Sequence, residues 1–460
     1  MSGDTTDGLW APERRALTTG LVLTITFIAS ESLAVITVMP VVAHDLKGLS
    51  LYGWVFSTFM LASLVGIVVA GRAADRHGPA RPYLAGIGLF TAGLVVAGLT
   101  PSMVVLVIGR GLQGLGAGAV PAVAYVSIGR SLPESLQPRM MAVLSTAWVL
   151  PGILGPSLAA VVAHLFGWRW VFLGIVPLVA ITAPLALPAL NRLGRPGATA
   201  ATEHRVLDGV RTAAGAALVL GACTSGRWYV GLPLVALGGL LGLPALRRLL
   251  PPHTLRAARG LPATILSRGL LTFAFFGADA YVTLTVTTVR HHSTVTAGLV
   301  VTASTLAWTA GAWVQARLNN RWEGSRLVRA GLLCVLAGTV GMALQLRSGV
   351  PVTEGFVAWA IAGFGMGLAY APITLMMLRA APAGREGWAS ASLNLADVLG
   401  TALGVGIGGA AVAAVTRSGD PVARGVAIAF LAAGAAGATG LVVTRRLPRT
   451  VSPTAPSLSR

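Results

Sequence analysis

The stretch Leu17–His44 reads LTTGLVLTITFIASESLAVITVMPVVAH, and Glu31 stands near the middle of this otherwise apolar run. About 20 apolar residues are enough for a helix to cross a hydrocarbon core of about 30 Å. Glu31 would therefore lie near the bilayer midplane, where an ionised side chain is costly. Such an acid persists when it faces a wet cavity, pairs with a cation or binds a proton, and each of these outcomes indicates transport.

The remainder of the chain has the same apolar character. Of its 460 residues, 55% are hydrophobic and only 11% are charged, and the mean hydropathy is +0.76. A soluble domain carries about 25% charged residues, so the composition indicates a polytopic membrane protein. The polar start Met1–Glu13, and the length of the apolar run after it, argue against a cleaved signal peptide.

Apolar runs separated by loops rich in Gly, Pro and Arg predict about fourteen membrane-spanning helices. The expected spans are about 17–43, 53–72, 82–100, 103–128, 140–164, 169–190, 206–224, 229–246, 262–289, 294–316, 326–346, 352–378, 387–415 and 423–444. We expect an N-terminal six-helix bundle (1–190), a linker with two extra helices (191–260), a C-terminal six-helix bundle (261–446) and a disordered tail (447–460).

The net charge of +19 comes from arginines that concentrate in alternate loops. This is the positive-inside pattern of a membrane protein, so we do not expect nucleic acid as a partner. The pattern places both termini and the tail in the cytoplasm. We therefore expect a multi-pass protein of the bacterial inner membrane that is monomeric and has lipid, protons and a small-molecule substrate as its partners.

An internal repeat relates the two six-helix halves. The matched positions are Gly114, Gly116 and Gly118 with Gly363, Gly365 and Gly367, and Arg72, Arg76 and Arg81 with Arg317, Arg321 and Arg326. Parallel repeats of this kind are a common plan for secondary transporters. The middle pair of helices lies outside the repeat and is interpreted as an insertion.

Four motifs follow one another in the first half. They are Gly71-Arg-Ala-Ala-Asp75-Arg76-His-Gly78-Pro-Ala-Arg81, Arg110-Gly-Leu-Gln113-Gly114-Leu-Gly116, Gly152-Ile-Leu-Gly155-Pro156 and Trp168-Arg-Trp-Val-Phe172. Together with about fourteen helices, they resemble the major facilitator superfamily. Glu31, nine residues before Pro40, resembles the first-helix acid of its fourteen-helix drug:proton antiporters. The resemblance implies an all-α membrane fold of two six-helix bundles in pseudo-twofold repeat, with two additional helices inserted between the halves.

The chain departs from the family pattern in three places. Glu31 stands where Asp is usual, Pro79 and Ala80 stand where basic residues are usual, and Ala159-Ala160 replaces a pair of glycines. The motifs cover the first 172 residues, and the second half matches mainly through the internal repeat.

The resemblance also implies gating roles. The residues concerned are Gly71, Asp75, Arg76, Gly78 and Arg81 in the loop after the second helix, and Gly152, Gly155 and Pro156 in the fifth helix. The loop would form a charge latch that closes the cytoplasmic side, with ordinary topogenic charge as the alternative. The fifth helix would bend and control the side to which the cavity opens, with a static kink as the alternative.

The candidates for proton coupling are Glu31, Arg110, Asp279 and Asp397. Burial disfavours an ionised carboxyl, whereas a cation such as Arg110 or a cationic substrate favours it. An acid balanced between these effects could take a proton from outside and release it when substrate binds. The alternatives are snorkelling of Arg110 and satisfied polar networks around the two aspartates.

For Glu31 the alternative is a structural hydrogen bond to Ser30, Thr24 or Thr37. Trp359 occupies the repeat position of Arg110. The halves are therefore not electrically equivalent, and we expect coupling to centre on the first half.

A polar and aromatic set is the candidate wall for an amphipathic ligand. Its members are Gln113, Trp148, Phe276, Tyr281, Trp308, Trp359, Tyr370 and Asn394. Most intramembrane aromatic residues simply pack or lie at interfaces, and that is the alternative.

No Walker loop, nucleophile elbow or zinc signature is present in the sequence. Cys223 and Cys334 lie in apolar segments, and we expect neither a disulfide nor a metal site. The chain is therefore not expected to be an enzyme or to hold a cofactor, and the proton gradient would be its energy source.

The leading hypothesis is a proton-coupled antiporter that exports amphipathic, cationic or multidrug-type small molecules by alternating access. A dedicated exporter of one natural product or lipid is the first alternative. Uptake by symport is another, against which Gly155-Pro156 argues. A membrane scaffold or sensor on a transporter fold is the non-transport alternative.

Overall fold

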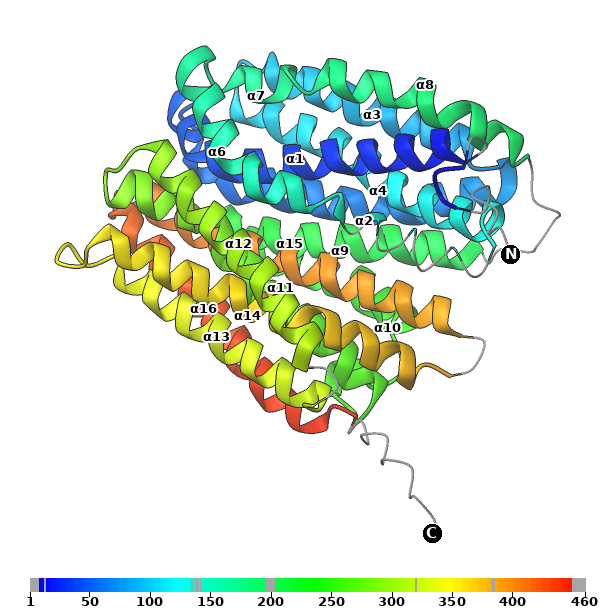
Figure 1. The fold of residues 1–460 in the computed structure, drawn as a ribbon. Coiled ribbons are helices and arrows are strands. Elements are labelled where there is room, and N and C mark those ends of the chain that lie inside the picture. The colour runs from blue at the N-terminus through cyan, green and yellow to red at the C-terminus, as the bar shows by residue number, and fades with distance from the viewer. Residues whose placement is uncertain are drawn as a thin grey trace, which may run out of the picture. The chain divides into compact units, whose positions relative to one another are not determined.

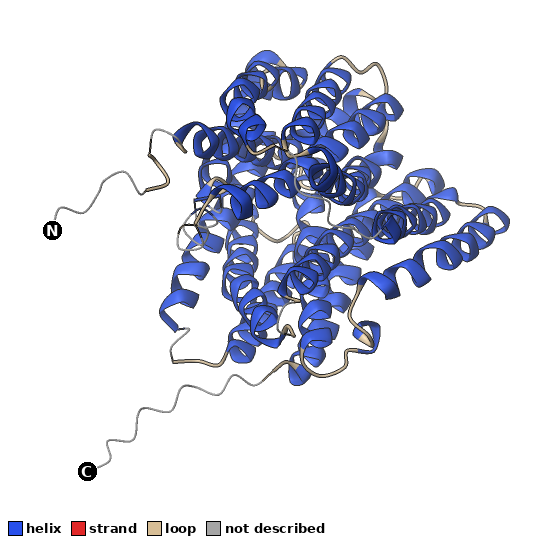
Figure 2. Ribbon diagram, turned by 90° about the vertical axis from the view of Figure 1, so that its right-hand side faces the viewer, coloured by secondary structure: helices blue, strands red, loops and turns tan. Residues whose placement is uncertain are grey.

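The computed structural model describes residues 8–11, 14–133, 136, 140, 143–144, 146–194, 203–318, 321–382 and 385–448. Regular structure in these residues is entirely helical (Figure 2). Thirteen of the described helices are long and apolar enough to cross a membrane, and Leu150–Phe166 is a shorter apolar helix. The helix content confirms the all-α membrane fold. The expected tail falls almost entirely outside the described residues.

Two compact units make up the chain, one built on residues 1–222 and 227–245 and the other on 223–226 and 246–460. Figure 1 labels the helices of the first unit: α1 (Arg15–Asp45), α2 (Tyr52–His77), α3 (Ala80–Gly98), α4 (Met103–Ser131), α6 (Val149–Phe166), α7 (Arg169–Leu173), α8 (Val176–Arg192), α9 (Glu203–Ser225) and α10 (Trp228–Leu249). A 3-10 turn (Leu49–Leu51) precedes α2. Within this unit α4 packs on α2 and α3, α1 packs on α6 and α8, and α3 packs on α8.

The second unit repeats this packing plan. Its helices are α11 (Leu261–Leu284), which continues as the π-helix Thr285–Val289, α12 (Thr294–Leu318), α13 (Gly324–Leu344), α14 (Val352–Ala380), α15 (Glu386–Ser418) and α16 (Val422–Val443), with 3-10 turns at Thr254–Arg256 and Thr444–Arg446. Here α14 packs on α12 and α13, α11 packs on α15 and α16, and α13 packs on α16. The internal repeat is therefore present in the packing, and α9 and α10 stand outside it.

The repeated glycines explain why the fourth helix of each unit lies so close to its neighbours. A Cβ atom built on Gly118 would collide with the carbonyl oxygen of Ser63 on α2, and one built on Gly367 would collide with that of Trp308 on α12. We call Gly114, Gly116 and Gly118 with Gly363, Gly365 and Gly367 the glycine stripes. Each member lies against the backbone of a neighbouring helix, where only hydrogen fits.

Two expected spans are interrupted. The fifth was expected from about residue 140, but α6 begins at Val149 after a turn at Ala147 and Trp148. Pro151 lies in the first turn of α6, where a missing backbone donor is tolerated. The sixth is divided into α7 and α8 by a break around Gly174, and Pro177 stands at the start of α8.

Candidate coupling and substrate sites

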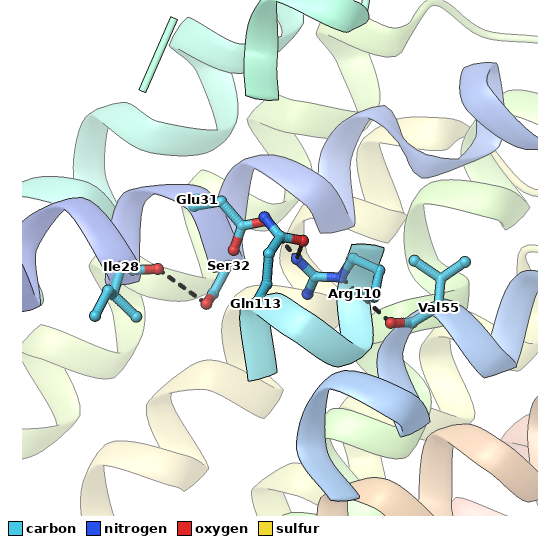
Figure 3. Close-up of polar contacts among 6 residues, drawn as sticks. All are labelled: Ile28, Glu31, Ser32, Val55, Arg110 and Gln113. Atoms are coloured by element: carbon cyan, nitrogen blue, oxygen red, sulfur yellow. Dashed lines mark hydrogen bonds and ion pairs between the residues drawn. The ribbon is translucent and has the colours of Figure 1, made fainter. Parts of the chain in front are cut away.

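A buried ion pair joins α1 to α4 in the first unit (Figure 3). Arg110 Nη1 donates to Glu31 Oε1 and, at 3.0 Å, to Gln113 Oε1. Gln113 Nε2 donates at 3.0 Å to the same Glu31 oxygen. Glu31 and Gln113 are fully buried, and Arg110 is 2% exposed. Three predicted residues, Glu31 of α1 with Arg110 and Gln113 of α4, thus form one hydrogen-bonded cluster.

Two residues of α2 also contact the guanidinium group of Arg110. Arg110 Nε donates to the carbonyl oxygen of Val55 at 3.3 Å, and its Cζ lies 4.2 Å from the centroid of the Phe59 ring. Figure 3 shows the side chain directed toward Glu31 and Gln113. Arg110 therefore does not snorkel to the surface.

The hydroxyl groups that could have bonded to Glu31 make other contacts. Ser30 donates to the Thr26 carbonyl, Thr24 to the Gly20 carbonyl and Thr37 to the Leu33 carbonyl, all within α1. The hydrogen bonds of the Glu31 carboxylate therefore come from α4.

The two oxygens of Glu31 have different surroundings. Oε1 accepts both hydrogen bonds of the cluster, whereas Oε2 is buried and has no hydrogen-bond partner among the described residues. Burying a charged oxygen without a donor is costly. A proton on Oε2 would remove that charge while leaving both acceptor contacts of Oε1 in place.

In the second unit a buried acid also forms a hydrogen bond with the fourth helix of its unit, α14. Asp279 on α11 accepts a hydrogen bond of 2.8 Å from Nε1 of Trp359 on α14. Asp279 is 4% exposed and Trp359 is fully buried. The sequence predicts both as site residues but does not predict their direct contact.

Trp359 belongs to an aromatic cluster formed by α11, α12 and α14. Phe275 stacks on Trp359 with ring centroids 5.2 Å apart and an interplanar angle of 11°. Trp308 lies 5.5 Å from Phe275 and 5.7 Å from Tyr370, and it also contacts Phe276 at 6.2 Å. Four of the predicted ligand-wall residues thus lie together, joined by Phe275.

Sequence reasoning missed Arg268, a charged residue on α11 that is 1% exposed. Its Nη2 donates to the Tyr370 carbonyl at 2.9 Å and to the Thr374 hydroxyl, and its Cζ lies 3.5 Å above the Tyr370 ring. Tyr370 in turn donates to Asp397 Oδ2 at 2.8 Å. An arginine inside the apolar run 262–289 was the signal that could have found this cluster.

Other predicted wall residues lie elsewhere. Tyr281 is fully buried and its hydroxyl donates to the Val405 carbonyl, so it joins α11 to α15. Trp148 lies in the turn before α6 and is 49% exposed, and Asn394 is exposed on α15. Trp148 and Asn394 therefore lie outside α11, α12 and α14, the helices that form the aromatic cluster.

The predicted gating residues occupy two places in the first unit. Gly155 and Pro156 lie inside α6, where Gly155 faces α1 at Ser30 and Leu33, which are one and two residues from Glu31 along the chain. Gly152 is buried one turn earlier on α6.

The loop residues lie at the end of α2 and the start of α3. Gly78 ends α2 with φ +82°, and Asp75, Arg76 and Arg81 are exposed, while Gly71 has open space beside it. The charge latch assigned to these residues stays a prediction.

Known proteins resemble this chain over most of its length. The model of the Major Facilitator Superfamily matches residues 19–405. A probable multidrug-efflux transporter of Mycobacterium tuberculosis is 29% identical over 461 residues, which cover 95% of this chain and 97% of that protein. Multidrug resistance protein Stp of the same organism is 27% identical, covering 78% of this chain and 68% of that protein.

Solved structures share the fold. A D-xylose-proton symporter superposes with a TM-score of 0.67 at 14% identity and covers 96% of this chain and 99% of its own. An auto-inhibited POT family peptide transporter gives a TM-score of 0.67 at 17% identity, with coverages of 95% and 99%. The helices, their repeat and the family match together show that the chain belongs to the major facilitator superfamily and is a multi-pass membrane transporter rather than an enzyme.

Proposed function

We propose that this transporter exports amphipathic small molecules of the cationic, multidrug type from the bacterial cytoplasm in exchange for protons, by alternating access. The relatives named as multidrug-efflux and multidrug-resistance proteins support the cargo class. Both termini would lie in the cytoplasm, and the proton gradient would replace any cofactor as the energy source.

The main support for proton exchange at Glu31 is that its two carboxylate oxygens have different surroundings. Arg110 and Gln113 both donate hydrogen bonds to Oε1, whereas Oε2 is buried and has no hydrogen-bond partner among the described residues. In the proposed cycle a proton from outside occupies Oε2, and the loss of that proton inside restores the negative charge. Arg110 keeps its contacts with Gln113 and Val55 in both states, so the cluster can lose and regain charge without being dismantled.

The second unit supplies the features that suit a cationic, amphipathic cargo. Aromatic faces attract cations, and carboxylates add charge complementarity. The aromatic cluster lies beside Asp279 through Trp359 and beside Asp397 through Tyr370. We propose that its partly exposed members, Phe276, Trp308 and Tyr370, contact the cargo.

Glu31→Gln is expected to abolish proton-driven transport, because a neutral amide cannot exchange a proton. The measurement uses the full chain in proteoliposomes with an imposed pH gradient and a fluorescent lipophilic cation as probe. We expect accumulation of the probe to fall at least tenfold, about the effect of 1.4 kcal/mol or more. Glu354→Gln, at an exposed acid in the first turn of α14, is the matched control and should transport normally.

Two outcomes would count against the proposal. If an imposed pH gradient leaves probe flux through the unaltered protein unchanged, proton coupling is wrong. If the gradient drives flux equally in the protein and in Glu31→Gln, the coupling site is not Glu31.

A further inference from the structure

The two units carry repeat-related acid–donor pairs that differ in charge. In each unit an acid on the first helix accepts a hydrogen bond from a side chain on the fourth helix, and that donor stands four residues before the glycine stripe. In the first unit the donor is Arg110, a permanent cation. In the second unit the donor is Trp359, whose indole N–H is neutral. The architecture is the same, but only Glu31 has a counter-charge.

This difference decides which form of each acid the protein stabilises. A buried carboxylate that loses its cationic partner is strongly destabilised, because no nearby charge replaces its lost hydration. Glu31 keeps such a partner and also receives a bond from Gln113. Asp279 is buried and receives one hydrogen bond from a neutral donor, which stabilises an ionised carboxyl less than an adjacent arginine would and which a protonated carboxyl can also accept on its carbonyl oxygen.

No other charged group in the described part of the second unit compensates Asp279. The charged or titratable residues on the helices packed around α11, and on α11 itself, are Arg256, Arg268, Tyr281, Arg317, Arg326, Arg329, Cys334, Glu354, Tyr370, Arg379, Glu386, Asp397, Arg417, Arg424, Arg445 and Arg446. Arg268 donates to α14, Asp397 is bonded by Tyr370, and Tyr281 donates to Val405. Trp359 is the partner that the described residues offer to the Asp279 carboxyl.

We propose that Asp279 is a second proton-carrying acid, which remains protonated while Glu31 is ionised, because it is buried beside the neutral donor Trp359 and has no cation among the described residues in the place that Arg110 takes beside Glu31. The inference rests on the proposed antiport and sets its stoichiometry at two protons inward for each monovalent cation outward. Such an exchange moves one net positive charge inward per cycle. Transport is then driven by the membrane potential as well as by the pH gradient.

Asp279→Asn tests this stoichiometry in proteoliposomes of the full chain. The unaltered protein should exchange two protons per lipophilic monovalent cation and respond to a potassium-diffusion potential. Asp279→Asn should exchange one proton, remain driven by the pH gradient and lose its response to the potential. Glu354→Gln should keep both responses. If Asp279→Asn keeps the ratio of protons to cations and the response to the membrane potential, the inference is wrong but the proposed antiport stands. If the unaltered protein shows no pH-driven flux, both the inference and the proposed antiport are wrong.

A measurement on the unaltered protein covers the case in which Asp279→Asn fails to fold. A hydrophobic carbodiimide reacts with protonated buried carboxyls, and mass spectrometry locates the adduct. At neutral pH we expect modification of Asp279 to exceed that of Glu31 at least tenfold. Equal modification, or preferential modification of Glu31, contradicts the assignment. Trp359→Arg, which copies the first unit's pairing, should abolish the preference by holding Asp279 ionised.

Discussion

Arg110→Gln is expected to destabilise the protein by about 3–5 kcal/mol at neutral pH, which is the usual effect of removing one partner from a buried ion pair. The substitution would leave Glu31, which is fully buried, with Gln113 as the donor to its carboxylate. It would also leave the Val55 carbonyl without the bond from Arg110. The measurement is thermal unfolding of the purified chain in detergent.

The double variant Glu31→Gln/Arg110→Gln distinguishes the loss of the ion pair from the cost of one unpaired buried charge. Removing both charges leaves no uncompensated ion, so most of the lost stability should return while pH-driven transport stays absent. Arg424→Gln is the matched control because Arg424 is 67% exposed and pairs with Asp420 at the surface. Surface pairs contribute about 0–1 kcal/mol, so this control should unfold near the original temperature. Equal unfolding temperatures for Arg110→Gln and Arg424→Gln would contradict the structural role given to the buried pair.

Gly118→Ala should destabilise the protein by about 1–3 kcal/mol or more, because overpacking forces neighbouring backbones apart. The new methyl group would collide with the Ser63 carbonyl of α2. Gly434→Ala provides a contrast of opposite sign, since Gly434 lies within α16 with open space around it. There alanine should stabilise the helix by about 0.5–1 kcal/mol.

The repeat supplies a further comparison. Gly367→Ala, at the position equivalent to Gly118, would meet the Trp308 carbonyl and should lower stability in the same direction. Membrane yield and unfolding temperature in detergent report all three variants. The interpretation of the glycine stripes fails if Gly118→Ala and Gly434→Ala prove equally stable.

Much of the fold follows from the sequence because lipid imposes simple requirements on a chain. The run Leu17–His44 predicts α1 to within two residues at its start and one at its end. Hydropathy could not predict the turn at Ala147 and Trp148 or the break around Gly174, since both interruptions occur inside apolar stretches. The position of a break depends on local backbone bonding, which mean hydropathy does not record.

Some features of the candidate sites can likewise be predicted from the sequence, and others cannot. Glu31 and Arg110 could be predicted because an intramembrane charge requires a partner, and each is the charged residue inside its own apolar run. The hydrogen bond between Asp279 and Trp359 can be inferred from the repeat, because Trp359 stands at the repeat position of Arg110. The stacking of Phe275 on Trp359 and of Arg268 on Tyr370 cannot be inferred from the sequence, because it depends on how each helix is rotated about its axis.

The packing of the first unit gives its ion pair a mechanical consequence. One trio of helices, α2, α3 and α4, is held together by the glycines of α4, and a second trio consists of α1 with α6 and α8. Arg110 lies on α4 of the first trio and Glu31 on α1 of the second, so their ion pair joins the two trios. In the proposed cycle, protonation of Glu31 removes one charge of this ion pair, so the binding of a single proton would loosen the connection between the two trios.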